Sequence, residues 1–238
     1  MCDVDRYVDR LYLPAIEQLE LRSVKTEWHR YAADLNRVPT DVDEASVIGS
    51  ANPKGKFRRG FHWQITTTKE VLMPAPISQV LHQELVHLIY EPFHESVRNQ
   101  YQFYHQQGFK KIYHVDLHSM PSVGTSEHND PGEKRADIVI SDCQGKSADP
   151  QFVDLVISAY VRAGFKVGFN WPYFGGRVSE QYGSPDRGQH AVQAELNRGL
   201  YMNEVNKKLL PDPENLKSVQ QKLSKALQYI KNNIPALP

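Results

Sequence analysis

The chain has 238 residues, a length that fits one large domain with its own core. Its 28 lysines and arginines balance its 28 aspartates and glutamates, so it lacks the positive surplus typical of nucleic-acid-binding proteins, and nucleic acid is not an expected partner. The first residues do not resemble a signal peptide, and no apolar run approaches the ~20 residues of a membrane span, so we expect a cytoplasmic protein without a membrane partner.

The first predicted element is an amphipathic helix over residues 8–21. Its apolar residues recur at helical spacing, and Pro14 is expected to bend or restart it. From 35 to 76 the chain is rich in Pro, Gly, Asp and Thr. This composition predicts an extended excursion with short strands around 57–67, and long irregular segments of this kind are often functional.

A long helix is predicted from Ser78, its N-cap, to about Gln106. Pro92 should kink this helix, and Gly108 should end it.

Three histidines of this helix do not form the His-Glu-x-x-His zinc motif. His82 and His87 are five positions apart and cannot share one helical face. His87 and His94 do share a face, and we interpret them as surface or hydrogen-bonded residues.

The second half of the chain alternates short apolar runs with helical patterns. Strands are predicted at 110–118, 135–142, 165–170 and 190–197, helices at about 150–163 and 213–232, and a glycine-rich loop lies between 171 and 188. This alternation indicates an α/β fold with a parallel or mixed sheet flanked by helices. No domain boundary is visible.

His118 is the sharpest local candidate for chemistry. The segment Asp116-Leu117-His118-Ser119 falls where a predicted buried strand gives way to a loop, and ligands of open α/β sheets bind at such strand ends. One ring nitrogen could bind a metal while a neighbouring carboxylate or carbonyl orients the other. A histidine that only hydrogen-bonds within the turn explains the position equally well.

Glu195 lies inside a predicted strand of otherwise apolar character. A buried carboxylate without a partner has a raised pKa, which suits a general acid or base near neutral pH. The alternative is an ion pair with Arg177, Arg187 or Arg198, and the pattern does not separate the two.

Asn36 and Arg37 form a third candidate, because a guanidinium beside an amide can hold a substrate carboxylate. Taken alone, such a short string is more often part of a structural salt bridge.

Six segments in this order resemble the N-formylglutamate amidohydrolase family over nearly the whole chain. They read CDVDRYVDRLY, HRYAADLNRVP, YHVDLHSMP, DIVISDCQGKSADP, FNWPYFGGRVSEQYGSP and HAVQAELNRGLYMNE. The resemblance implies a fold similar to that of zinc carboxypeptidases and aspartoacylase, with a mixed, largely parallel sheet flanked by helices.

The resemblance also implies site residues and a function. Asp5 and His118 match metal ligands of one Zn²⁺, and Glu195 matches the glutamate that activates water. Substrate contacts are implied for Arg30, Asn36, Arg37, Arg177 and Tyr182. The implied reaction is hydrolysis of the amide of an N-formyl or other N-acyl acidic amino acid with a free carboxylate, first of all N-formyl-L-glutamate to formate and L-glutamate.

One departure affects the implied metal site. The family carries a Pro-His-(Ser/Ala)-Gly motif, with its first metal-ligand histidine, upstream of the position of Asp5, and residues 1–238 do not contain it. We therefore expect a single domain without the family's first strand. A truncated or misplaced start of the sequence is the favoured explanation. Alternatively, another segment, Cys2 or a nearby histidine could replace the ligand, or the chain could be a non-catalytic or altered-substrate relative with a degenerate metal site.

Overall fold

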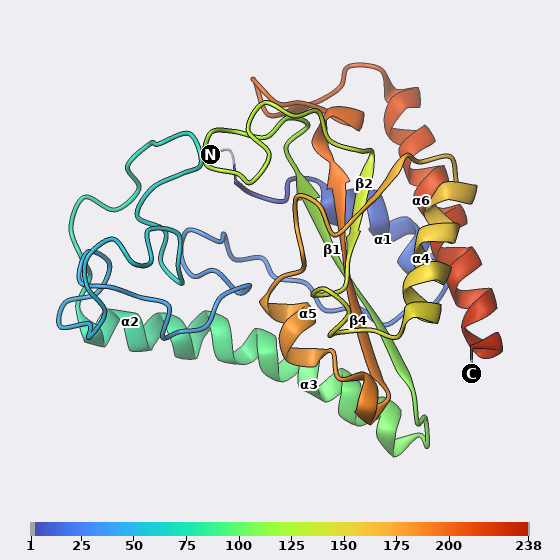
Figure 1. Ribbon diagram of the computed structural model, residues 1–238, viewed down its shortest axis with the longest axis horizontal. Helices are drawn as coiled ribbons and strands as arrows, with labels where there is room; N and C mark the ends of the chain where they lie inside the picture. The colour runs from blue at the N-terminus through green and yellow to red at the C-terminus, as the bar shows by residue number, and fades with distance from the viewer. Residues whose placement is uncertain (1–2, 238) are drawn as a thin grey trace. The chain divides into compact units, whose positions relative to one another are not determined.

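The computed structural model describes residues 3–237 (Figure 1). Its contacts divide the chain into two compact units. We call them the sheet unit, made of Asp5–Ser23 with the chain from Lys110 onward, and the excursion unit, made of the chain through Val4 with Val24–Phe109. The junctions between the two units carry no compositional signal in the sequence.

The sheet unit contains a mixed four-stranded sheet formed by described residues. In spatial order its strands are β1 (Ile112–Met120), β4 (Gln189–Asn197), β2 (Ile138–Ser141) and β3 (Val167–Phe169). β1 pairs with β4 in parallel, β2 pairs with β3 in parallel, and β2 is antiparallel to β4. The prediction of an α/β fold with a largely parallel sheet is confirmed.

Three helices pack together beside this sheet (Figure 1). They are α1 (Val8–Gln18), α4 (Pro150–Arg162) and α6 (Pro213–Asn233). Their apolar faces and one face of the sheet form the main core. The remaining elements of the unit are the short helix α5 (Arg177–Tyr182), which packs against β4, the strand pair β5 (Met202–Asn203) and β6 (Lys208–Leu209), and the 3₁₀ turns η2 (Pro185–Arg187), η3 (Arg198–Leu200) and η4 (Ile234–Ala236).

The period of two along each strand separates the two faces of the sheet. Tyr113, Val115 and Leu117 of β1 pack into the helix-covered core together with alternate residues of β4. The residues between them project to the opposite side. We call this side the polar face, and it carries His114, Asp116, His118, Gln193 and Glu195.

Pro14 does not restart α1, which is one of the two outcomes expected there. The helix runs through it, and the loss of the proline N–H leaves the carbonyl of Arg10 without its helical donor. Gln220 of α6 donates its side-chain amide to that oxygen at 2.9 Å. Tertiary packing therefore supplies the hydrogen bond that the local sequence removes.

The long helix of the excursion unit begins at its predicted cap. The Ser78 hydroxyl accepts the N–H of Leu81 at 3.1 Å. The helix consists of α2 (Gln79–Leu85), a π-helical turn η1 (Val86–Tyr90) and α3 (Glu91–Gln106), and it ends before Gly108, which has a φ of 86°. The distortion of the helix expected at Pro92 is this π turn. It changes the pattern of backbone hydrogen bonds where the proline has no N–H to donate. No helix among residues 3–237 is long and apolar enough to cross a membrane.

The strands predicted around 57–67 are wrong. Only isolated bridges join Arg59 to Trp63 and Ile65 to Val71 in the described segment. The Asp43 carboxylate accepts the backbone N–H of Gly55 at 3.0 Å and that of Phe57 at 2.8 Å. Side-chain acceptors thus satisfy backbone donors that a strand ladder would otherwise use.

A buried histidine pair in the excursion unit should make stability depend on pH. His62 Nε2 lies 2.9 Å from His82 Nδ1, and its Nδ1 lies 3.1 Å from the carbonyl of Ala32. Burial, with the neighbouring His82, lowers the pKa of His62 to about 4.

In the unfolded chain His62 binds a proton near pH 6.5, whereas in the folded chain it does so only near pH 4. The free energy of unfolding should therefore fall by up to about 3 kcal/mol as the pH drops from 6.5 to 4. Urea unfolding across this range measures the effect. His62→Gln, which does not titrate, should flatten this part of the curve, and an unchanged curve in that variant would exclude His62 as the cause.

Candidate active site

Asp5 and His118 come together although 113 positions separate them. His118 lies near the end of β1, and its Nδ1 is 2.9 Å from Oδ2 of Asp5, which precedes α1. Oδ1 of Asp5 accepts the backbone N–H of Ser119 at 2.8 Å and its hydroxyl at 3.1 Å. Both carboxylate oxygens are therefore held against the end of one strand.

Asp116 places a second carboxylate beside the same imidazole. Its Oδ2 lies 3.0 Å from Nε2 of His118, yet neither buried atom has an aligned hydrogen bond, so the contact is electrostatic. Burial alone would lower the pKa of His118, but the charges of Asp116 and Asp5 raise that pKa well above its usual value. The two carboxylates thus favour the protonated form of the imidazole.

Glu195 lies directly opposite His118 in the parallel pairing of β4 with β1. Its side chain is buried, and Oε1 accepts the side-chain amide of Gln193 at 2.5 Å. Burial raises the pKa of Glu195, and the charge of His118 partly offsets this. The carboxylate is consequently poised to exchange a proton closer to neutral pH than an ordinary glutamate.

The sequence leaves open whether Glu195 transfers protons or forms an ion pair with Arg177, Arg187 or Arg198, and the structure gives the partners of these arginines. Arg177 pairs with Glu180 at 3.1 Å, and Arg187 donates to Ser184 at 3.0 Å. Arg198 is close enough to lower the pKa of Glu195, but its guanidinium donates to the hydroxyl of Ser119 at 3.0 Å and to its carbonyl at 2.8 Å.

Arg198 also belongs to the candidate site, although its sequence position suggested only an ion pair with Glu195. It directly follows β4, is 5% exposed, and approaches Oδ1 of Asp5 at 3.6 Å. Its bonds to Ser119 tie the end of β4 to the end of β1. The alternation along β4 gives no signal for Arg198, because position 198 has the parity of the core-facing Val192, Ala194 and Leu196.

The substrate contacts expected in the excursion unit already have protein partners. Arg30 donates to the carbonyl of Asp3 at 2.8 Å and to Asp34 at 3.2 Å. Arg37 donates through Nε to the carbonyl of Arg59 at 3.2 Å and through Nη1 to that of Asn36 at 2.8 Å. These bonds hold the guanidinium of Arg37 in place and leave its Nη2 for another acceptor.

Arg177 and Tyr182 lie at the two ends of α5. This short helix was not predicted, because its six residues were read as part of a glycine-rich loop. Tyr182 is buried, and two residues later Ser184 forms an isolated bridge with Gln189 at the beginning of β4.

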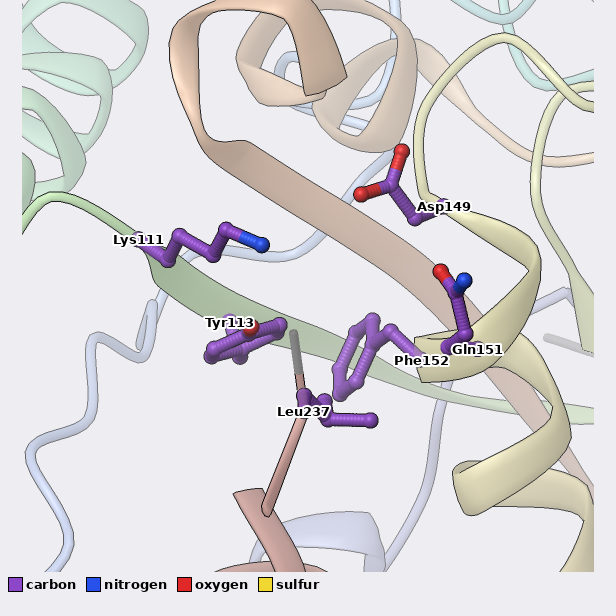
Figure 2. A pocket seen from close by; sticks show the side chains of 6 residues that line it. All are labelled: Lys111, Tyr113, Asp149, Gln151, Phe152 and Leu237. Atoms are coloured by element: carbon purple, nitrogen blue, oxygen red, sulfur yellow. The ribbon is translucent and has the colours of Figure 1, made fainter. Parts of the chain in front are cut away.

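A shallow pocket at the other end of β1 is separate from these residues (Figure 2). It is lined by Lys111, Tyr113, Asp149, Gln151, Phe152 and Leu237 and encloses about 150 Å³, part of it open solvent. Ligand pockets usually measure ~300–1,000 Å³. The ionisable residues of the polar face, rather than this hollow, are the candidate active site.

The residues present fit a zinc ion only in part. Nδ1 of His118 and Oδ2 of Asp5 are 2.9 Å apart, a hydrogen-bond spacing, whereas two tetrahedral zinc ligands lie about 3.4 Å apart. A metal would also have to replace the proton on His118. Among residues 3–237 no group of three His, Cys, Asp or Glu side chains is arranged to hold a metal, and Cys2 lies outside the described residues. The described residues therefore do not form a complete catalytic zinc site.

Comparison with known proteins identifies a family and a curated relative. The model of the N-formylglutamate amidohydrolase family matches residues 2–202. An N-formylglutamate deformylase of Pseudomonas putida is 28% identical over 205 residues, which cover 85% of this chain and 72% of that protein.

Two solved structures share the fold. The crystal structure of N-formylglutamate amidohydrolase from Ralstonia eutropha JMP134 superposes with a TM-score of 0.84 at 24% identity, covering 98% of this chain and 84% of that one. A gene product of Agrobacterium tumefaciens gives a TM-score of 0.60 at 19% identity, covering 96% and 79%.

Proposed function

Because the chain belongs to the N-formylglutamate amidohydrolase family, we propose that it hydrolyses N-formyl-L-glutamate to formate and L-glutamate. The observation that carries this proposal is the buried carboxylate of Glu195 opposite the His118–Asp5 pair at adjacent strand ends. A carboxylate with a raised pKa, next to a fixed charged pair, suits proton transfer during amide hydrolysis.

Glu195 is assigned the proton transfers. Gln193 holds Oε1, so Oε2 is the oxygen that takes a proton from the attacking water. The same proton then passes to the nitrogen of glutamate as the carbon–nitrogen bond breaks. Asp5, Ser119 and Arg198 keep His118 in place beside this reaction.

The substrate's carboxylates are proposed to be ligands of Arg37 and its neighbour Asn36, with Arg30 as a further contact. Nη2 of Arg37 still has N–H groups to donate, whereas Nε and Nη1 are hydrogen-bonded to carbonyl oxygens. A guanidinium held in this way loses little side-chain freedom when it binds a carboxylate.

Zinc is proposed from the family resemblance, with Asp5 and His118 as two of its ligands. Bound there, it would supply a polarised carbonyl and a more acidic water. The proposal needs a third donor beyond those that the described residues provide.

The experiment is to incubate the purified full chain with N-formyl-L-glutamate and measure formate and glutamate. The expected result is one of each per substrate consumed, with slower turnover of N-formyl-L-methionine, which lacks the second carboxylate, and of N-acetyl-L-glutamate, which carries a larger acyl group. Elemental analysis and chelation are run on the same preparation. Activity that survives complete metal removal would reject zinc and keep the hydrolase, whereas no formate with or without added zinc would support a non-catalytic relative.

A further inference from the structure

A hydrogen bond holds the backbone of Tyr173 over the polar face of the sheet. Its carbonyl accepts the hydroxyl of Ser141 at 2.7 Å. Ser141 ends β2 and lies opposite Gln193 in the antiparallel pairing with β4. Residues directly opposite in such a pair project to the same face. The backbone of Tyr173 is therefore anchored at the level of Gln193, two residues before Glu195.

The phenol hydroxyl of Tyr173 is fixed by a second anchor. Nη1 of Arg135 donates to that hydroxyl at 2.9 Å and to the carbonyl of Pro121 at 3.1 Å. The guanidinium carbon also lies 5.1 Å from the centre of the tyrosine ring. Pro121 follows the last residue of β1, which lies opposite Asn197. The second anchor is thus two residues beyond Glu195.

Arg135 is itself immobilised by Asp130. Nε and Nη2 donate to the two carboxylate oxygens at 2.7 and 2.8 Å, and both side chains are only 1% exposed. Replacing both members of a buried ion pair by apolar residues of similar size is often neutral for stability, although removing only one member is costly. The geometry of the pair of Asp130 and Arg135 defines the direction of the phenol of Tyr173.

The hydrogen-bond directions leave the phenol with a free donor. A guanidinium only donates, so the hydroxyl oxygen of Tyr173 is the acceptor of the bond from Arg135. Among residues 3–237 the hydroxyl hydrogen of Tyr173 has no acceptor. The two anchors lie on either side of the level of Glu195, so the phenol crosses the polar face beside that carboxylate. Burial and the charge of Glu195 raise the pKa of Tyr173, which keeps the hydrogen on the phenol.

We propose that Tyr173 is a catalytic residue whose hydroxyl donates a hydrogen bond to the carbonyl oxygen of the scissile amide. The role rests on the proposed hydrolysis. Water forms a bond to the formyl carbon while the carbonyl π pair moves to oxygen, and Glu195 takes the proton of water. Tyr173 stabilises the oxygen anion and keeps its own proton. The pair returns as the carbon–nitrogen bond breaks, and Glu195 protonates the nitrogen.

The test is Tyr173→Phe, which removes the donor and keeps the ring. A donor used mainly after attack lowers kcat by about 10²–10³-fold and leaves KM nearly unchanged. Tyr113→Phe is the matched control, because it also removes one phenol hydroxyl but lies on the opposite face near the start of β1. Figure 2 shows Tyr113 among the residues that line the shallow pocket. Circular dichroism and thermal unfolding establish that both variants are folded at the assay temperature.

The possible results distinguish a failure of the role of Tyr173 from a failure of the proposed function. Wild-type hydrolysis with a kcat of Tyr173→Phe within threefold of normal would overturn the role of Tyr173 and leave the proposed function intact. A raised KM with normal kcat would also overturn it, because the hydroxyl would then contribute only to substrate binding. Absence of hydrolysis by the wild-type chain would remove the proposed function and this inference together.

Discussion

Glu195→Gln should reduce the hydrolysis of N-formyl-L-glutamate by about 10²–10⁴-fold while the chain stays folded. The amide keeps the size of the side chain but does not take a proton from water. Burial raises the pKa of Glu195, so the wild-type enzyme should lose activity on the acid side at a higher pH than an ordinary glutamate would impose. Initial rates across pH 4–8, with formate as the measured product, test both statements.

Glu214→Gln is the control for this substitution. Glu214 lies in the first turn of α6, is exposed, and pairs with Lys217 at 2.7 Å. The same change there should leave turnover at the wild-type level. Near-normal turnover by Glu195→Gln would eliminate Glu195 as the proton acceptor, and an unaltered acid limb in a slower variant would assign that limb to another group.

Arg135→Met should lower the free energy of unfolding by about 3–5 kcal/mol, the largest stability loss that we expect from a single change. The substitution leaves the carboxylate of Asp130 buried without its two guanidinium bonds. It also removes the donor that holds the hydroxyl of Tyr173. Urea unfolding at neutral pH gives the change in free energy, and turnover measured well below the thermal midpoint should fall as well.

A double variant separates the buried charge from a general packing defect. Adding Asp130→Asn to Arg135→Met removes the unpaired charge and should restore part of the lost stability. Lys217→Met breaks an exposed pair and should have little effect. If the double variant were less stable than Arg135→Met by the full loss that Asp130→Asn causes alone, unpaired charge would not be the origin of the loss.

Segments that carry the family resemblance coincide with the strand ends at which the candidate site lies. His118 and Glu195 were proposed on their positions in short apolar runs, and the register places them opposite each other. Tyr173 was not singled out, although its segment carries part of the resemblance. Its proposed role depends on a hydrogen bond from Arg135 to its hydroxyl and on one from the hydroxyl of Ser141 to its carbonyl, and neither contact has a local pattern.

By itself the sequence determined the elements whose signals are local. The helix after Ser78, the strands around His118 and Glu195, and the final helix follow from caps and periodicity, which act over a few residues. Tertiary structure decided the rest, because contacts between distant segments override local preference. Gln220 lets α1 continue through Pro14, Asp43 satisfies backbone donors where strands were predicted, and Ser119 brings Asp5 to His118. Such partners have no fixed spacing along a chain, so only the folded structure identifies them.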